Sequence, residues 1–293
     1  MHGGSDSTTV PSDEPSHSTG SEGPSFAMPS QACDCHMHVF DNAYPLAEGA
    51  EIHHPNAGIG AYRRLQNRLG LTRNVLVQPS SYGLDNRLLV SALAELGNFS
   101  RGVAVVDDSV SPDELETLTR SRVTGARFNL VQRGATHIGM LQAVAQRVRP
   151  LGWHIQIHMR PTDLVAHYQV IDALPVPVVI DHMARFATEP SIQRSLHDCV
   201  RALLSNGKTW MKLSGAYLAS QQASPPFSDL SDFVAEMVRD FPTRLLWGSD
   251  WPHATETIKP DDGALLSMLG HWIPDEVVRA QILERNPALL YGF

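Results

Sequence analysis

The first apolar run of the chain, DCHMHVF at residues 34–40, carries two histidines separated by one residue. Side chains alternate between the two faces of an extended strand, so His36 and His38 point to the same side, about 6.5 to 7 Å apart along the chain. Two imidazoles placed in this way can share one metal ion or one substrate oxygen. We interpret this run as the first strand of the fold and the first part of a candidate active site.

Three later apolar runs also end in polar residues. His158 closes WHIQIH at residues 153–158, His182 closes VVIDH at 178–182, and Asp250 closes LLWGSD at 245–250. Helix-like segments separate such runs, and this alternation is typical of parallel βα units. The candidate strands are eight, at about residues 32–39, 73–78, 101–106, 124–130, 153–158, 176–181, 208–214 and 243–249.

Eight strands are the number needed for a TIM-like (β/α)8 barrel, which is the fold that we predict. In such a barrel, the reactive groups sit at the carboxyl ends of the strands and on the loops that follow. We therefore expect His158, His182 and Asp250 to converge on His36 and His38.

Composition limits the class of protein. The length of 293 residues and the 42% hydrophobic content suffice for one barrel domain, expected at residues 32–293. A net charge of −8 without a basic cluster argues against nucleic acid. Three cysteines, Cys33, Cys35 and Cys199, form neither a disulfide framework nor a thiolate zinc site.

The stretch of residues 1–31 is rich in Ser, Pro, Gly, Thr and acidic residues, which indicates a disordered leader. It lacks the pattern of a signal peptide, and nowhere do about 18 apolar residues follow one another. From these features we expect a cytoplasmic protein without a membrane partner. The sequence leaves the oligomeric state open.

The polar residues at the strand ends suit two kinds of chemistry. Neutral imidazoles and a carboxylate can hold zinc, cobalt or iron, with one position open for water. Zinc is the first choice, and the candidate ligands are His36, His38, His158 and Asp250, with His182 free to contact substrate or a bound hydroxide. In the metal-free alternative, Asp250 is the general base and the histidines polarise a carbonyl. Both alternatives lead to hydrolysis or proton transfer.

The motif GSDWPH at residues 248–253 supports a functional role for Asp250, because its glycine and proline fix the chain around a carboxylate at a strand exit. Arginines at other predicted strand exits indicate an anionic substrate, since a guanidinium binds a carboxylate through two parallel hydrogen bonds. Candidate substrate-binding residues are Arg127, Arg133, Arg185, Ser80, His158 and Tyr217. For each arginine, the alternative is a salt bridge to a loop carboxylate.

Over residues 32–293, the chain resembles the amidohydrolase superfamily. The similarity is to the branch that contains 2-pyrone-4,6-dicarboxylate lactonase, sulfomuconolactone hydrolase and galactarolactone isomerase. The motifs that carry it are DxHxH at 34–38, QPS at 78–80, DN at 85–86, GAR at 125–127, DHMAR at 181–185, KLSG at 212–215 and GSDWPH at 248–253.

This resemblance implies a distorted (β/α)8 barrel in which Asp250 activates water against a lactone carbonyl. In the family, histidines polarise this carbonyl, and the residues of this sequence that match them are His36, His38 and His182. Arginines that hold substrate carboxylates in the family match Arg127, Arg133 and Arg185. The pyrone dicarboxylate lactonase itself works without a metal.

Two departures from the lactonase pattern bear on the substrate. A tyrosine of that enzyme is replaced by His158, which matches a ligand of metal-dependent decarboxylase relatives, and an arginine is missing near Tyr217. The leading hypothesis is therefore hydrolysis of a small carboxylated lactone that differs from the pyrone. The alternatives are lactone isomerisation, metal-dependent decarboxylation, and a noncatalytic barrel that binds sugar acids.

Overall fold

The computed structural model describes residues 17–132 and 134–293. Eight parallel strands follow one another around a single sheet, and each pairs with the next along the chain. Their bounds are β1 Cys33–Met37, β2 Arg73–Val77, β3 Ser100–Ala104, β4 Val123–Asn129, β5 His154–His158, β6 Val178–Ile180, β7 Thr209–Leu213 and β8 Leu245–Trp247. This arrangement confirms the predicted (β/α)8 class.

The barrel closes through the segment that follows β8 and not through β8 itself. The Asp250 amide donates to the His36 carbonyl at 2.8 Å, and the His38 amide donates to the Trp251 carbonyl at 2.8 Å. A parallel bridge pairs Met37 with Trp251. Closure therefore brings Asp250 directly beside the two histidines of β1.

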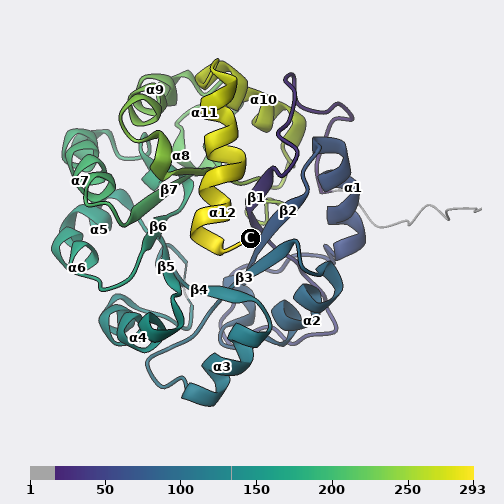
Figure 1. The fold of residues 1–293 in the computed structure, drawn as a ribbon, viewed down its shortest axis with the longest axis vertical. Coiled ribbons are helices and arrows are strands. Elements are labelled where there is room, and N and C mark those ends of the chain that lie inside the picture. The colour runs from purple at the N-terminus through teal and green to yellow at the C-terminus, as the bar shows by residue number, and fades with distance from the viewer. Residues whose placement is uncertain (1–16, 133) are drawn as a thin grey trace, which may run out of the picture.

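Helices surround the strands, and the last two lie across one end of the barrel, with the carboxyl terminus near its centre (Figure 1). The longer helices are α1 Ile59–Leu69, α2 Arg87–Leu96, α3 Pro112–Arg120, α4 Leu141–Val148, α7 Gln193–Ser205, α9 Ser231–Asp240 and α10 Asp262–Trp272. The shorter ones are α5 Pro161–Ala166, α6 Tyr168–Asp172, α8 Ala216–Ala219, α11 Glu276–Ala280 and α12 Asn286–Tyr291. At α3, Ser111 accepts the amide of Glu114 and Pro112 occupies the first turn, as the sequence predicts.

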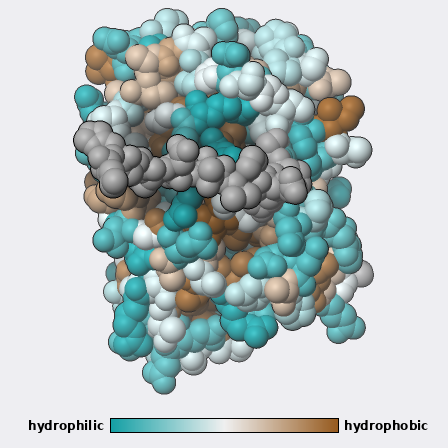
Figure 2. Space-filling view, turned by 90° about the vertical axis from the view of Figure 1, so that its right-hand side faces the viewer, coloured by the Kyte–Doolittle hydropathy of each residue, from teal (hydrophilic) through white to brown (hydrophobic). Residues whose placement is uncertain are grey.

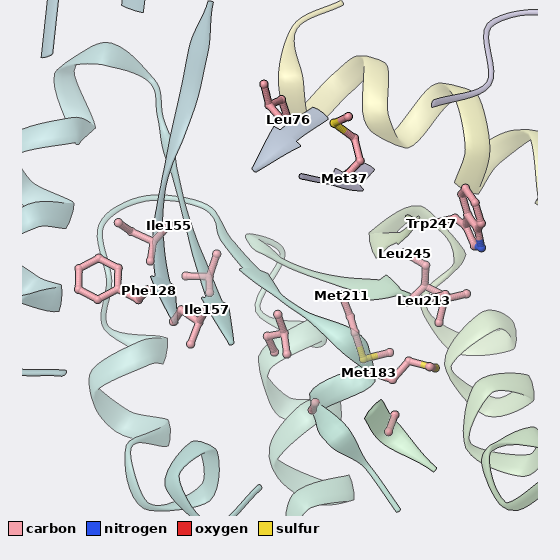
Figure 3. Packing of buried hydrophobic residues seen from close by; sticks show 14 of the residues in the cluster. Met37, Leu76, Phe128, Ile155, Ile157, Met183, Met211, Leu213, Leu245 and Trp247 are labelled. Atoms are coloured by element: carbon pink, nitrogen blue, oxygen red, sulfur yellow. The ribbon is translucent and has the colours of Figure 1, made fainter. Parts of the chain in front are cut away.

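The strands contribute side chains to two separate clusters of buried apolar residues. Ile155 and Ile157 of β5 belong to the larger cluster, which includes residues of the surrounding helices (Figure 3). The smaller cluster contains Cys33 and Cys35 together with Tyr291 of α12. Because side chains alternate along a strand, Gln156, which lies between the two isoleucines of β5, faces the other way. On β5 this second face is polar, whereas on β2 and β6 it carries apolar residues of the smaller cluster, such as Val75 and Val179.

Part of the expected leader, residues 17–31, lies in contact with the barrel. The Thr19 amide donates to the Pro260 carbonyl at 3.0 Å. The side chains of Phe26 and Met28 pack against the main core, and Arg279 lies 4.8 Å from the centre of the Phe26 ring. The average composition of residues 1–31 hides these two side chains, which are half-buried in the structure. Residues 1–16 lie outside the described residues.

The surface carries scattered apolar side chains. On the face shown in Figure 2, hydrophilic and hydrophobic residues are interspersed. Within the described part of the chain, none of the helices has the length and apolar character needed to cross a membrane.

Candidate active site

A cavity of about 40 Å³ opens where the strands end. Its lining comes from the carboxyl ends of the strands and the loops that follow, as expected for a βα barrel. The lining residues are His38, Phe40, Ile52, Pro79, Ser80, Ser81, Arg127, Asn129, Gln132, His158, His182, Leu218, Asp250, Ala254 and Thr255. The ends of seven of the eight strands, all except β3, therefore contribute to one pocket.

The carboxylate of Asp250 lies among three imidazoles. Its Oδ1 atom is 3.5 Å from Nε2 of His36, 3.5 Å from Nε2 of His38 and 3.8 Å from Nε2 of His182. The Nε2 atoms of His36 and His38 are 3.2 Å apart. The four residues that the sequence assigned to catalysis thus meet at one point.

Neighbouring groups fix the orientation of these imidazoles. The Nδ1 atom of His38 donates to the Val77 carbonyl at 2.7 Å, which leaves its Nε2 atom unprotonated in the neutral ring. His182 follows β6, and its Nδ1 atom lies 3.0 Å from the Ser214 hydroxyl after β7. Each ring is therefore held through Nδ1 while Nε2 faces Asp250.

The backbone of Asp250 is itself unusual. Its φ of 65° lies in the left-handed region, which non-glycine residues rarely adopt, and such conformations cluster at functional sites. Gly248 precedes it, and a Cβ atom there would lie 2.6 Å from the Cβ atom of His36. The glycine of the GSDWPH motif is therefore required by the close approach of β1.

A buried ion pair lies beneath His36. The ammonium of Lys212 donates to Oε1 of Gln156 at 2.7 Å and lies 3.3 Å from both Oδ1 of Asp181 and Nδ1 of His36. The other oxygen of Asp181 accepts from the Gln156 amide at 2.9 Å. Sequence analysis assigned no role to Lys212, although a lysine within the apolar strand TWMKL was the available signal.

Burial sets the protonation states of the site. Burial lowers the pKa of His36 well below its ordinary value, and the charge of Lys212 lowers it further. Burial likewise lowers the pKa values of His158 and His182. Burial alone would raise the pKa of Asp250, but the adjacent imidazoles, His182 first, hold it well below its ordinary value. At neutral pH the imidazoles of His36, His158 and His182 are thus neutral, and the carboxylate of Asp250 is ionised.

Arg127 is the guanidinium that lines the cavity among the described residues. It is 4% exposed and donates through NH1 to the Gln78 carbonyl at 2.9 Å, while its Nε atom has no described hydrogen-bond partner. Ser80, also predicted, lines the same cavity, and its hydroxyl accepts from the Asn129 amide at 2.8 Å. Asn129 and Gln132 are lining residues that the sequence analysis did not single out.

The remaining predicted substrate contacts have different surroundings. Arg185 is half-buried after β6 and lies outside the cavity lining given above, and Arg133 lies outside the described residues. His158 does line the cavity, with its ring 4.8 Å from that of His182. The Tyr217 hydroxyl contacts Asp250 and His253, so it is engaged with the candidate base.

The distances between the imidazole nitrogens and the Asp250 oxygen are suitable for binding a metal ion. One ligand atom each from His36, His182 and Asp250 lies within 4.8 Å of the others. The separations of 3.2 Å between the β1 histidines and 3.5 Å from each to Asp250 are also close to those around tetrahedral zinc. Zinc bonds of about 2.0 to 2.1 Å would place ligand atoms about 3.3 to 3.4 Å apart. The geometric cluster contains His182, whereas the predicted ligand set contained His158.

A parallel barrel with a buried carboxylate among imidazoles at its strand exits defines a barrel enzyme with a hydrolase-type site. The chain belongs to the amidohydrolase family, whose model matches residues 33–293. This agrees with the resemblance seen in its motifs.

Relatives of known activity cover nearly the whole chain. It is 34% identical to the 2-pyrone-4,6-dicarboxylate hydrolase of Comamonas testosteroni, over 92% of each chain. It is 32% identical to the 4-sulfomuconolactone hydrolase of Rhizobium radiobacter, over 92% of each chain. The D-galactarolactone isomerase of Agrobacterium fabrum is 29% identical, over 92% of this chain and 93% of the relative.

Solved structures show the same barrel. An apo structure from Agrobacterium tumefaciens has a TM-score of 0.83 at 28% identity, covering 92% of this chain and 98% of that one. A probable 2-pyrone-4,6-dicarboxylic acid hydrolase from Acinetobacter baumannii, with citric acid bound, has a TM-score of 0.78 at 26% identity. That match covers 90% of this chain and 100% of the other.

Proposed function

We propose that this protein hydrolyses a small carboxylated lactone, with Asp250 as the general base. The observation that carries the proposal is the position of Asp250 Oδ1, 3.5 to 3.8 Å from three imidazole nitrogens. Two of the relatives are named as hydrolases of pyrone and muconolactone compounds, which supports lactone hydrolysis over other amidohydrolase reactions.

The protonation states suit attack by water on a carbonyl. The ionised carboxylate of Asp250 accepts the proton of the attacking water. The lactone carbonyl oxygen, on which negative charge develops, accepts a hydrogen bond from an imidazole. His182 is placed for this role when Ser214 donates to its Nδ1 atom at 3.0 Å, because its hydrogen then resides on Nε2.

Lys212 determines which nitrogen of His36 carries the hydrogen. When the ammonium donates to Nδ1, the hydrogen resides on Nε2 and faces Nε2 of His38 at 3.2 Å. In the other tautomer, Nδ1 donates to Asp181 at 3.3 Å and Nε2 is free to bind a metal. His36, His38 and Asp250 would then hold the ion, with His182 or His158 completing the set. A bound zinc would supply Lewis acid polarisation of the carbonyl.

Arg127 provides the anchor for the substrate carboxylate. Its guanidinium lies at the wall of the cavity, and its buried Nε atom has no hydrogen-bond partner among the described residues, so a substrate carboxylate would supply the missing counter-charge. Citric acid bound to the Acinetobacter baumannii protein shows that a related chain takes up a small polycarboxylate. We therefore propose a substrate with a ring ester and at least one carboxylate.

Lactone isomerisation is the second candidate, because a relative is named D-galactarolactone isomerase. The same carboxylate would then move a proton within the substrate instead of activating water. Product analysis by NMR in ¹⁸O-labelled water separates the two reactions, since hydrolysis alone incorporates a water oxygen into the ring-opened acid.

The test of the proposed base is the Asp250→Asn variant, assayed on a panel of carboxylated lactones and their uncharged esters. An amide cannot accept the proton, so we expect kcat to fall by about 10²- to 10⁴-fold with the fold intact. Asp108→Asn, in an exposed loop, is the matched control. An Asp250→Asn variant with wild-type turnover would refute the assignment.

A further inference from the structure

A chain of three hydrogen bonds leads away from the buried side of Asp250. The Tyr217 hydroxyl donates to Oδ2 of Asp250 at 2.8 Å. The same hydroxyl oxygen lies 2.8 Å from Nδ1 of His253, and Nε2 of His253 lies 3.0 Å from Oδ2 of Asp262. His253 and Asp262 are fully buried, so solvent does not replace these contacts.

The number of available hydrogens determines which atom donates in each of these three hydrogen bonds. Each of the three contacts needs one hydrogen between its heavy atoms, and Tyr217 supplies only one. If that hydrogen goes to Asp250, the two others belong to the His253–Asp262 pair, and Nδ1 of His253 donates to the Tyr217 oxygen. The pair then supports the hydroxyl without adding net charge next to Asp250.

The two carboxylate oxygens of Asp250 have different surroundings. Oδ2 is occupied by Tyr217, while Oδ1 faces the imidazoles of His36 and His38 at 3.5 Å. Rotation of the carboxylate would break the Tyr217 contact and place an oxygen away from the imidazoles. Because the backbone of Asp250 is in the left-handed region, its conformation depends on such external contacts.

Asp262, the last residue in this series of hydrogen bonds, lies on a helix. Asp262 is the first residue of α10, and its backbone amide donates to the Ser18 hydroxyl oxygen at 3.3 Å. The backbone of His253 is also fixed, because its amide donates to the Asp250 carbonyl at 2.8 Å and its carbonyl accepts from Lys259 at 2.8 Å. Outer contacts of this kind are what orient reactive side chains in other enzymes.

We propose that Tyr217, His253 and Asp262 are positioning residues that hold Asp250 with Oδ1 toward the imidazoles. This inference rests on the proposed function, in which Asp250 is the base. It gives Tyr217 a role different from direct substrate binding, since its hydroxyl is already engaged by Asp250 and His253.

The two roles of Tyr217 predict different kinetics. In Tyr217→Phe, loss of positioning lowers kcat by about 10- to 100-fold and leaves KM within about twofold. A substrate-binding role would instead raise KM. Tyr168→Phe, on α6, is the control for removal of a hydroxyl and should retain both constants.

A double-mutant cycle tests whether His253 acts through Tyr217. His253→Gln should also lower kcat, but in the Tyr217→Phe background it should change kcat by less than about twofold, because the contact it supports is already absent. Fully additive effects would overturn the proposed chain. Melting temperatures of all variants separate lost positioning from lost folding.

Crystal structures of wild type and Tyr217→Phe give a readout that does not depend on turnover. We expect the carboxylate of Asp250 to rotate away from the imidazoles in the variant, and an unchanged carboxylate would overturn the inference. If wild type hydrolyses no lactone of the panel, the proposed function fails, and these structures still decide whether Tyr217 positions Asp250.

Discussion

The carboxylate of Asp34 accepts two hydrogen bonds from Ser249, one from the amide at 2.9 Å and one from the hydroxyl at 2.6 Å. Asp34 lies on β1 and Ser249 lies two residues after the end of β8, so the pair connects the first and last strands of the barrel. The His36 amide donates to the same carboxylate at 3.0 Å. Burial raises the pKa of Asp34 to about 6, although the bonds from Ser249 oppose this shift. The register between Asp250 and the histidines of β1 therefore depends on Asp34.

Removal of the Ser249 hydroxyl should weaken the contact between Asp34 and Ser249. In Ser249→Ala, a buried carboxylate oxygen loses its shortest hydrogen bond, so we expect the free energy of unfolding to fall by about 1 to 3 kcal/mol. We also expect kcat to fall, because Asp250 is the next residue. Urea unfolding and steady-state kinetics measure the two effects, with Ser205→Ala at the end of α7 as the control. Wild-type values for both quantities would show that the pair is dispensable.

Substitution of Arg127 should affect substrate binding more than turnover. A charge-assisted hydrogen bond contributes about 1.5 to 3 kcal/mol, so Arg127→Gln should raise KM about 10- to 150-fold for a carboxylated lactone. The KM for the uncharged ester of the same lactone should change little. Arg185→Gln is the matched comparison, because Arg185 lies outside the cavity lining. An equal rise in KM for both variants would contradict the assignment of the anchor to Arg127.

Zinc binding should depend on the β1 histidines. Protein stripped with a chelator should take up one zinc ion per chain, and zinc at 100 times its Kd should add about 2.7 kcal/mol to the free energy of unfolding. This stabilisation should disappear in His38→Gln and persist in His53→Gln, which alters an exposed loop. Elemental analysis and differential scanning calorimetry measure it. Zinc stabilisation that survives His38→Gln would place the ion elsewhere.

Stability in acid should report on His154. Burial, followed by the charge of Lys212, lowers the pKa of this histidine to about 3, whereas an unfolded histidine titrates near 6.5. The unfolded chain therefore binds a proton that the folded chain excludes, and stability is lost as the pH falls from about 6.5 toward 3.

In His154→Leu, this contribution is absent, so the free energy of unfolding should fall less steeply below pH 6.5. The expected difference in slope is about 1.4 kcal/mol per pH unit, which corresponds to one proton. Urea unfolding between pH 4 and 7 measures the slope, with the exposed His271→Gln as the control. Parallel curves for wild type and His154→Leu would show that His154 titrates normally in the folded protein.

The number and order of the strands were predictable from local sequence. Short apolar runs alternating with helical segments identified all eight strands, because burial against helices requires apolar residues at alternate positions of each strand. Polar residues in and after these runs predicted His36, His38, His182 and Asp250 as site residues, and the structure brings the four side chains together. The contacts of residues 17–31 were not predictable, because average composition hides the two side chains that pack against the core.

The tertiary structure decided which groups touch. The distance of 3.5 Å between Asp250 and the β1 histidines follows from closure of the barrel through the segment after β8, which joins residues more than 200 positions apart. The environments of Lys212 and Tyr217 likewise arise only where separate strands meet. Local sequence sets the direction in which a side chain leaves its own strand, whereas its partner and its degree of burial are set by the other strands.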